Sequence, residues 1–236
     1  MLVPDRHRLA LEIVEICSWM YQKGFIASTE GNVSACLDSD RLLVTPRGAH
    51  KGLLRPEQLV VTDLTGRQIS GDLPPSSELP LHLLVYRERP DVMGVVHAHP
   101  TMAIVCSLAG ISFDDGVIPE VITSLGGIPI APYATPGTDE AAEVISPFIQ
   151  QFDAIVLARH GSVTVGHDLR EAYSRLEMLE HTAQILVLSR LLGPLSPLPK
   201  DEVARLLIAG GRLPVDRTQP APTQNRPLWP RLHGRE

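Results

Sequence analysis

Two histidines stand one residue apart at the end of an apolar run, Val95-Val96-His97-Ala98-His99. If this run is a β-strand, side chains at positions i and i+2 point to the same face, so both imidazoles project together. Two imidazoles on one face can bind a metal ion from two sides. The alternative is a pair of unrelated surface histidines, and the short pattern alone does not exclude it.

A second apolar run, from Ala154 to Ala158, leads into His160 and Gly161. If both runs are strands that end near each other, His160 adds a third nitrogen to His97 and His99. Three protein ligands with one open position are the usual design of a catalytic zinc site, where the open position polarises a substrate oxygen. We therefore expect His97, His99 and His160 to form a metal-binding face.

The segment Ser76-Ser77-Glu78 stands before a predicted helix. Two hydroxyls and the free backbone N–H groups of a helix start form a suitable cradle for a phosphate. Glu78 would lie beside that cradle, where a carboxylate could move a carbon-bound proton of a metal-bound hydroxyketone. The alternative is an ordinary serine-capped helix with an acidic residue in its first turn.

Two further loops carry polar groups suited to a ligand, Glu30-Gly31-Asn32-Val33-Ser34 and Thr45-Pro46-Arg47-Gly48. Glycine allows a ligand to approach the backbone closely, and asparagine offers both a donor and an acceptor. The alternatives are an ordinary Asn-Gly type of turn in the first loop and a strand-ending turn with a solvated Arg47 in the second.

The composition is that of an ordinary soluble globular protein, with 44% hydrophobic and 20% charged residues among 236. A chain of this length can bury a core without a structural metal, so a metal site is expected to be catalytic. The net charge of -6 and the scattered Lys and Arg residues argue against nucleic acid as a partner. Three cysteines without a C-x-x-C motif, no signal-peptide pattern and no apolar run of about 18 residues lead us to expect a cytoplasmic protein and no membrane contact.

Hydrophobic periodicity and turn residues predict a mixture of helices and strands, which is an α/β or α+β fold. We expect one domain over residues 1–210 and a Pro-rich, flexible tail over residues 211–236. Pro147 is expected to kink or divide a helix that Thr138 caps. The expected helices cover residues 5–22, 77–88, 100–110, 169–192 and about 201–209, and the expected strands cover residues 42–45, 59–62, 92–97, 128–131, 154–158 and 163–165.

Taken together and in order, these pieces resemble the class II aldolase/adducin family. The matching motifs are GNVS at 31–34, TPRG at 45–48, SSE at 76–78, HAH at 97–99, APYATPGT at 131–138 and RHG at 159–161. The resemblance covers about residues 6–210. It implies a single-domain, three-layer fold with a central, mainly antiparallel sheet flanked by helices.

The resemblance also assigns roles to individual residues. It implies that Zn²⁺, or another divalent ion such as Mn²⁺, Co²⁺ or Fe²⁺, is bound by His97, His99 and His160. Glu78 would be the acid/base residue and would also touch the metal when substrate is absent. The substrate phosphate would be held by Gly31, Asn32, Gly48, Ser76 and Ser77. Family members usually assemble as homotetramers with sites at subunit interfaces.

The chain departs from the fuculose phosphate aldolases of this family at two positions near the expected site. Arg47 precedes Gly48 where those enzymes have threonine, and it could grip a phosphate or carboxylate bidentately. Glu120 stands near the position of a tyrosine of those enzymes and could supply a second proton-transfer group. The alternatives are a solvated Arg47 and an acidic residue at a helix start. The tail has Trp229 and no match to the family's C-terminal tyrosine.

The leading functional hypothesis is a zinc-dependent aldehyde-lyase of carbohydrate metabolism. It would cleave a small ketose 1-phosphate, such as L-fuculose 1-phosphate, to dihydroxyacetone phosphate and an aldehyde. The alternative is another reaction on the same metal, namely a dehydratase of the methylthioribulose-1-phosphate type, a decarboxylase or a sugar-phosphate 4-epimerase. A third hypothesis is an adducin-like module without activity, which the intact set of His97, His99, His160 and Glu78 disfavours.

Overall fold

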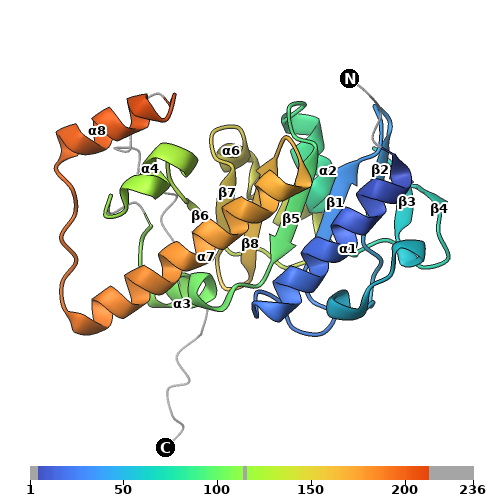
Figure 1. The fold of residues 1–236 in the computed structure, drawn as a ribbon, viewed down its shortest axis with the longest axis horizontal. Coiled ribbons are helices and arrows are strands. Elements are labelled where there is room, and N and C mark those ends of the chain that lie inside the picture. Colours follow the sequence, from blue (N-terminus) through green and yellow to red (C-terminus); the bar gives the residue numbers. More distant parts are fainter. Residues whose placement is uncertain (1–4, 114–115, 213–236) are drawn as a thin grey trace, which may run out of the picture.

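The computed structural model describes residues 5–113 and 116–212. Eight strands of the described residues form one sheet in the order β4-β3-β2-β1-β5-β8-β7-β6, in which all neighbours are antiparallel except β6 and β7 (Figure 1). The strands are β1 (Asn32–Cys36), β2 (Arg41–Val44), β3 (Val60–Asp63), β4 (Gln68–Ser70), β5 (Gly94–Ala98), β6 (Ile130–Ala131), β7 (Ala154–Leu157) and β8 (Gly161–Gly166).

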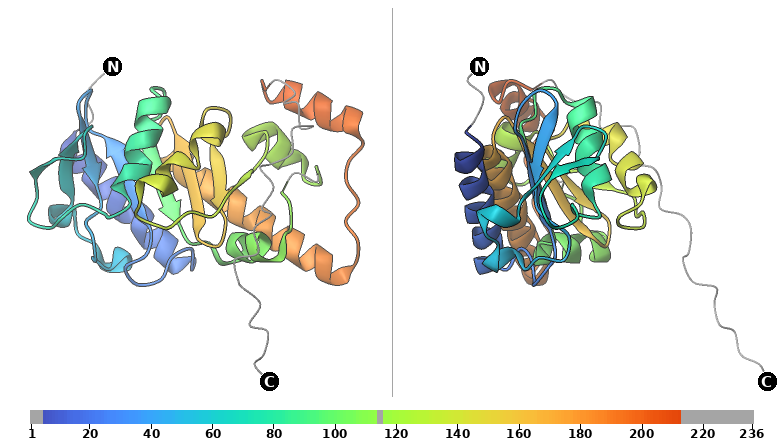
Figure 2. Two further views of the ribbon diagram at one scale, coloured as in Figure 1. Left: turned by 180° about the vertical axis from the view of Figure 1, so that it is seen from behind. Right: turned by 90° about the vertical axis from the view of Figure 1, so that its right-hand side faces the viewer.

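Helices cover both faces of the sheet, so the fold has three layers (Figure 2). Helices α1 (Arg6–Gln22) and α7 (Leu169–Leu192) cover one face, and α2 (Leu79–Glu88), α5 (Asp139–Glu143) and α6 (Ser146–Ile149) cover the other. The remaining helical segments are α3 (Thr101–Ala109), α4 (Pro119–Leu125), α8 (Lys200–Ala209) and the short 3-10 helices η1 (Lys51–Leu53) and η2 (Pro56–Gln58). This architecture is the predicted α/β arrangement around a mainly antiparallel sheet.

The longest helices form where apolar periodicity and capping residues coincide. In α1, Leu9, Ile13, Ile16 and Met20 are buried at spacings of three and four residues, and the Asp5 side chain accepts a hydrogen bond from the first turn. In α7, Asp168 accepts from the N–H of Glu171 at 2.8 Å, as a helix start requires.

The register of the three central strands β1, β5 and β8 brings the end of β5 beside the starts of β1 and β8. Strand β5 lies between β1 and β8, with His97 opposite Asn32 on one side and opposite Val163 on the other. The final residue of β5, Ala98, pairs with Ser162 near the start of β8. Residues at the end of β5 therefore lie beside the first residues of β1 and β8.

Most predicted elements are present with shifted ends, whereas two strands, one α-helix and the two short 3-10 helices were not predicted. Pro147 lies at the start of α6, so the helix capped by Thr138 is divided as expected. Strands β1 and β4 and helix α4 had no counterpart among the predicted elements. Strand β1 was read only as a ligand-binding loop, although four of its five residues are buried. The predicted tail lies outside the described residues from residue 213 onward.

Candidate metal centre

Four side chains that could hold a metal ion meet where the ends of β1, β5 and β8 converge. One ligand atom from each of Glu78, His97, His99 and His160 lies within 4.8 Å of the others. His97 and His99 come from the end of β5, His160 from the turn between β7 and β8, and Glu78 from the start of α2. The structure therefore brings together the three histidines and the glutamate that the sequence singled out.

Three distances within this group approach the ligand spacing around a tetrahedral ion, with His97 and His160 facing different oxygens of Glu78. Metal–ligand bonds of about 2.0–2.1 Å place neighbouring ligand atoms about 3.3–3.4 Å apart. The Nε2 atoms of His97 and His99 are 3.1 Å apart, and Nε2 of His97 lies 3.2 Å from Oε2 of Glu78. Nε2 of His160 lies 3.2 Å from Oε1 of Glu78. Three imidazoles and one carboxylate are a donor set that suits Zn²⁺ and similar divalent ions.

The ring of His97 is held in the orientation that a metal ligand needs. Its Nδ1 donates to the backbone carbonyl of Ser162 at 2.9 Å, and the side chain is fully buried. This contact fixes the ring so that Nε2 faces Glu78 and His99. A metal-binding histidine is commonly oriented by such a contact to a carbonyl.

His160 reaches the other histidines because β8 begins unusually close to β5. A Cβ atom at Gly161 would lie 2.2 Å from the carbonyl oxygen of Ala98, so only glycine fits there. Arg159 has a left-handed backbone with φ of 65°, and its N–H donates to Ser107 Oγ at 3.0 Å. The tight turn and the close approach together place His160 beside His97.

Burial and neighbouring charges shift the pKa values of two candidate ligands, His99 and Glu78, in the directions that favour cation binding. Burial, with the nearby His97 and His160, lowers the pKa of His99 to about 3, so its ring is neutral and can donate a lone pair. For Glu78, burial is the largest single influence and raises the pKa. His97 and His160 outweigh it and hold the pKa of this carboxyl well below its usual range.

The residues predicted to bind phosphate lie on loops that contact one another. Gly31 has a φ of 67°, and a Cβ there would lie 2.9 Å from the carbonyl oxygen of His97. This loop therefore packs closely against the backbone of one candidate metal ligand. Thr45, at the start of the loop that contains Arg47 and Gly48, contacts both of the other loops. Its Oγ1 accepts from the N–H of Val33, next to Asn32, and its carbonyl accepts from the N–H of Ser76. The phosphate role of these residues stays a prediction.

Arg47 and Gly48 form an exposed turn beside these loops. The N–H of Arg47 donates to the carbonyl of Pro74 at 2.9 Å, while its side chain is exposed in a single chain. Lys51, which was not among the predicted site residues, connects the segment after this turn to the loop before β1. Its buried Nζ donates to the carbonyls of Thr29 and Ala49, at 3.0 and 2.9 Å.

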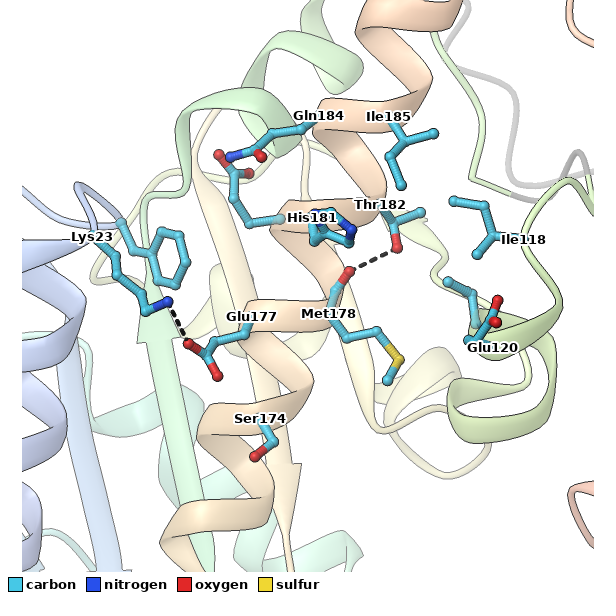
Figure 3. Close-up of a pocket in the computed structure, with 13 residues that line it drawn as sticks. Lys23, Ile118, Glu120, Ser174, Glu177, Met178, His181, Thr182, Gln184 and Ile185 are labelled. Carbon is cyan, nitrogen blue, oxygen red and sulfur yellow. Dashed lines mark hydrogen bonds and ion pairs between the residues drawn. The ribbon is translucent and has the colours of Figure 1, made fainter.

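Glu120 lies apart from the four candidate ligands. It is exposed in the first turn of α4 and lines a groove along α7, together with Lys23, Met178 and His181 (Figure 3). In this groove Lys23 forms an ion pair with Glu177 at 2.9 Å. Within one chain, Glu120 is not brought into the metal group, and its proton-transfer role stays a prediction.

Asn32 lies inside the site, and its side chain is already engaged. Its Nδ2 donates to Oε2 of Glu78 at 2.8 Å, and its Oδ1 contacts Nε2 of the buried His82. His82 was not among the predicted site residues, although residues 78, 82 and 86 follow one another at helical spacing and so share one side of the helix. Any role of Asn32 toward phosphate therefore combines with its contact to Glu78.

Comparisons with known proteins identify the family of this chain. Residues 11–187 match the Class II Aldolase and Adducin N-terminal domain. The chain is 35% identical over 186 residues to the 3-oxo-tetronate 4-phosphate decarboxylase of Pectobacterium atrosepticum, covering 77% of this chain and 85% of that protein. It is 36% identical over 175 residues to the L-fuculose phosphate aldolase of Methanococcus vannielii, covering 74% and 93%.

A solved structure with the same fold is YgbL of Escherichia coli. It superimposes with a TM-score of 0.78 at 34% identity and covers 86% of this chain and 99% of that one. In residues 5–113 and 116–212, no helix combines the length and apolar character needed to cross a membrane.

Proposed function

This chain belongs to the class II aldolase and adducin family, and we propose that it is a divalent-metal-dependent decarboxylase of a small phosphorylated 3-oxo acid. The observation that carries this proposal is the meeting of Glu78 with His97, His99 and His160 beside the three polar loops. Similarity to 3-oxo-tetronate 4-phosphate decarboxylases supports the choice of substrate class.

The reaction breaks the bond between the carboxylate carbon and its neighbour in the 3-oxo acid. The bonding electron pair moves toward the 3-oxo group, carbon dioxide leaves, and the neighbouring carbon takes up one proton. For 3-oxo-tetronate 4-phosphate, the product is dihydroxyacetone phosphate. A divalent ion held by the three histidines would act as a Lewis acid on the 3-oxo oxygen.

Glu78 would transfer the proton to that carbon. It lies next to the histidines, and its side chain is 17% exposed, so it can exchange protons with solvent. Gly31, Ser76 and Ser77 would hold the phosphate through backbone N–H and hydroxyl groups. Arg47 would bind a second anionic group, and a 3-oxo acid phosphate carries both a phosphate and a carboxylate.

The second candidate is the retro-aldol cleavage of a ketose 1-phosphate, and the similarity to L-fuculose phosphate aldolase supports it. Both reactions would leave the same enediolate of dihydroxyacetone phosphate, because they differ only in the fragment that departs. The departing fragment is carbon dioxide in one case and an aldehyde in the other. A metal with three histidines and one glutamate serves both.

The test measures both fragments from one protein preparation. The metal-loaded enzyme is given 3-oxo-tetronate 4-phosphate and, separately, a panel of ketose 1-phosphates that includes L-fuculose 1-phosphate. We expect release of carbon dioxide and dihydroxyacetone phosphate in equal amounts from the first substrate, with Zn²⁺, Mn²⁺, Co²⁺ and Fe²⁺ compared. The His160→Ala variant serves as the matched inactive control. Aldehyde release from a ketose 1-phosphate, without decarboxylation of the 3-oxo acid, would replace the proposal with the aldolase reaction.

A further inference from the structure

Starting from the candidate metal ligand Glu78, polar side chains from the start and body of helix α2 alternate with side chains of strand β1 in one continuous series of hydrogen bonds. The order is Glu78, Asn32, His82, Ser34 and Tyr86, and we call these five residues the polar ladder. It begins at the candidate metal ligand Glu78 and runs along the space between α2 and the sheet.

The ladder forms because the two elements have nearly the same repeat along their length. Four helical residues rise about 6.0 Å, and two strand residues rise about 6.6–6.8 Å. Glu78, His82 and Tyr86 stand four residues apart on one side of α2. Asn32 and Ser34 stand two residues apart on one face of β1. Each strand side chain can therefore fit between two successive helix side chains.

The direction of the hydrogen bonds follows from the Asn32 amide. Its Nδ2 only donates and points to Oε2 of Glu78 at 2.8 Å, and its Oδ1 only accepts and points to His82. Nε2 of His82 must then carry the proton and donate to Oδ1. This leaves Nδ1 of His82 to accept from Ser34 Oγ at 2.6 Å, and Ser34 Oγ accepts from the Tyr86 hydroxyl at 2.9 Å.

The three middle residues of the polar ladder are buried away from water, so their hydrogen-bond partners cannot be replaced by solvent. His82, Asn32 and Ser34 are 2%, 4% and 1% exposed. Burial, and then His97, lowers the pKa of His82 to about 3, so this ring is neutral and can accept at one nitrogen while it donates at the other. Buried polar groups with all their partners in place hold a single arrangement, because any flip leaves a group unpaired.

We propose that Asn32 and His82 are positioning residues that hold one carboxylate oxygen of Glu78 and so fix this side chain against the metal and the substrate. The inference rests on the proposed function to the extent that Glu78 moves the proton there. The ladder orients Glu78 and does not conduct protons to it, because an amide separates His82 from the carboxylate. The second N–H of Asn32 Nδ2 can still face a substrate.

The test compares two substitutions of similar size at one position. His82→Gln keeps an N–H that can donate to Asn32, whereas His82→Leu keeps the volume and removes the donor. We expect His82→Leu to lower kcat by about 10- to 100-fold and to weaken metal binding by about 10-fold, as loss of a ligand-orienting contact does. KM should change little, and His82→Gln should recover most of both losses. Thr164→Val removes a buried hydroxyl bonded to the Ala172 carbonyl, away from the ladder, and controls for stability.

Two readouts need no substrate, so they separate failure of the ladder from failure of the proposed reaction. Chelator competition gives the metal affinity, and ¹⁵N NMR of the metal-free protein identifies which nitrogen of His82 carries the proton. We expect the proton on Nε2. A proton on Nδ1, or a folded His82→Leu variant that matches Thr164→Val in kcat and metal affinity, would overturn the proposal. If His82→Leu does not fold, Asn32→Asp replaces it, since this isosteric change removes the N–H that Glu78 accepts and should lower kcat by about as much, and an unchanged kcat would overturn the proposal.

Discussion

The Nε2 atoms of His97 and His99 lie 3.1 Å apart and face each other. His97 carries its proton on Nδ1, which donates to a backbone carbonyl, and the pKa of His99 is lowered to about 3. In the metal-free chain, neutral His99 can donate a proton from Nε2 to His97 across this distance. A metal ion would take the place of that proton and bind the folded site, so ion binding should also stabilise the fold.

The first prediction is that His160 is needed to retain the metal. His160→Ala removes one of three imidazoles, so we expect most of the metal to be lost on dialysis against a mild chelator. The loss should be accompanied by a lower melting temperature in the presence of Zn²⁺. Elemental analysis and thermal unfolding measure the two effects. His181→Ala, an exposed histidine on the α7 groove, is the control and should retain full occupancy. Full occupancy in His160→Ala would remove this residue from the site.

The second prediction separates proton transfer from metal retention at Glu78. In Glu78→Gln the side-chain oxygen can still accept from Asn32, so the geometry of the site is kept while the titratable group is lost. We expect turnover to fall on the order of 10²-fold or more, as for the loss of a general acid/base. Most of the metal should remain, because the three histidines are intact. Steady-state kinetics with metal analysis on the same preparation tests this, and near-normal turnover would contradict the role.

The third prediction compares two glycines that share a left-handed backbone. Gly31 and Gly48 have φ values of 67° and 72°, yet a Cβ at Gly31 would lie 2.7 Å from Ile26 Cγ2, whereas Gly48 has no heavy atom within 4 Å. Gly48→Ala should cost about 1–2 kcal/mol from the backbone alone. Gly31→Ala should cost about 1–3 kcal/mol more and should also lower activity, since the loop touches His97. Denaturant unfolding measures both, and equal losses would contradict the crowding at Gly31.

Local signals in the sequence predicted most of the fold. Asp5 and Asp168 cap helices with strong apolar periodicity, so α1 and α7 could be placed from residue types alone. Strand β1 was not predicted, because its polar positions Asn32 and Ser34 are residue types that strands rarely favour, and here they are buried against α2 and not exposed to solvent. Its asparagine and serine drew attention as ligand groups instead.

Part of the candidate site could likewise be predicted from local sequence patterns, and part could not. His97 and His99 share a face because of the two-residue repeat of a strand, which is readable without a structure. The contact of His82 with Asn32 joins residues 50 positions apart, and it depends on the register between α2 and β1. No local pattern contains that register. The position of Glu120 in the α7 groove likewise depends on how α4 packs, and α4 itself was not predicted.

The fourth prediction concerns Asp153, a buried carboxylate near the opposite end of β7. It contacts Arg212 at 2.8 Å, Arg89 at 3.0 Å and Arg175 at 3.3 Å. Burial raises the pKa of Asp153, but these guanidinium groups outweigh burial and lower the pKa below its ordinary value. The stabilisation is therefore present above the unfolded-state pKa of about 3.9 and is lost as the pH falls through the lower folded-state value.

Asp153→Asn should accordingly lower the free energy of unfolding at pH 7 by about 1–3 kcal/mol, since Arg212 loses its carboxylate while Arg89 keeps Asp91 and Arg175 keeps Glu171. The difference from wild type should shrink as the pH falls toward the acid limit. Denaturant unfolding over a pH series measures it. Asp91→Asn, in which Arg89 keeps Asp153 and the exposed partner is lost, should have a much smaller effect. A difference that stays constant with pH would contradict the ionic origin of the stabilisation.

The fifth prediction concerns Arg47 and Glu120, which are both exposed in a single chain. Arg47 adjoins the predicted phosphate loops, so Arg47→Ala should mainly raise KM if the side chain binds substrate and transition state equally. Glu120→Gln should mainly lower kcat if Glu120 moves a proton. The second effect requires that another subunit bring the α4 end of the α7 groove to the metal group, as the family's expected tetramer would. Arg55→Ala, an exposed arginine elsewhere, is the control for charge.

A measurement of mass in solution makes the outcome for Glu120 decisive. If the protein is an oligomer and Glu120→Gln lowers kcat without changing the mass, Glu120 acts across a subunit interface. If the protein is a monomer, or if kcat is unchanged, Glu120 has no part in the reaction. Mixing metal-free His160→Ala with Glu120→Gln protein gives a further check, because each variant lacks a different component. Mixed oligomers should regain part of the activity only when one site draws Glu120 from one chain and the histidines from another.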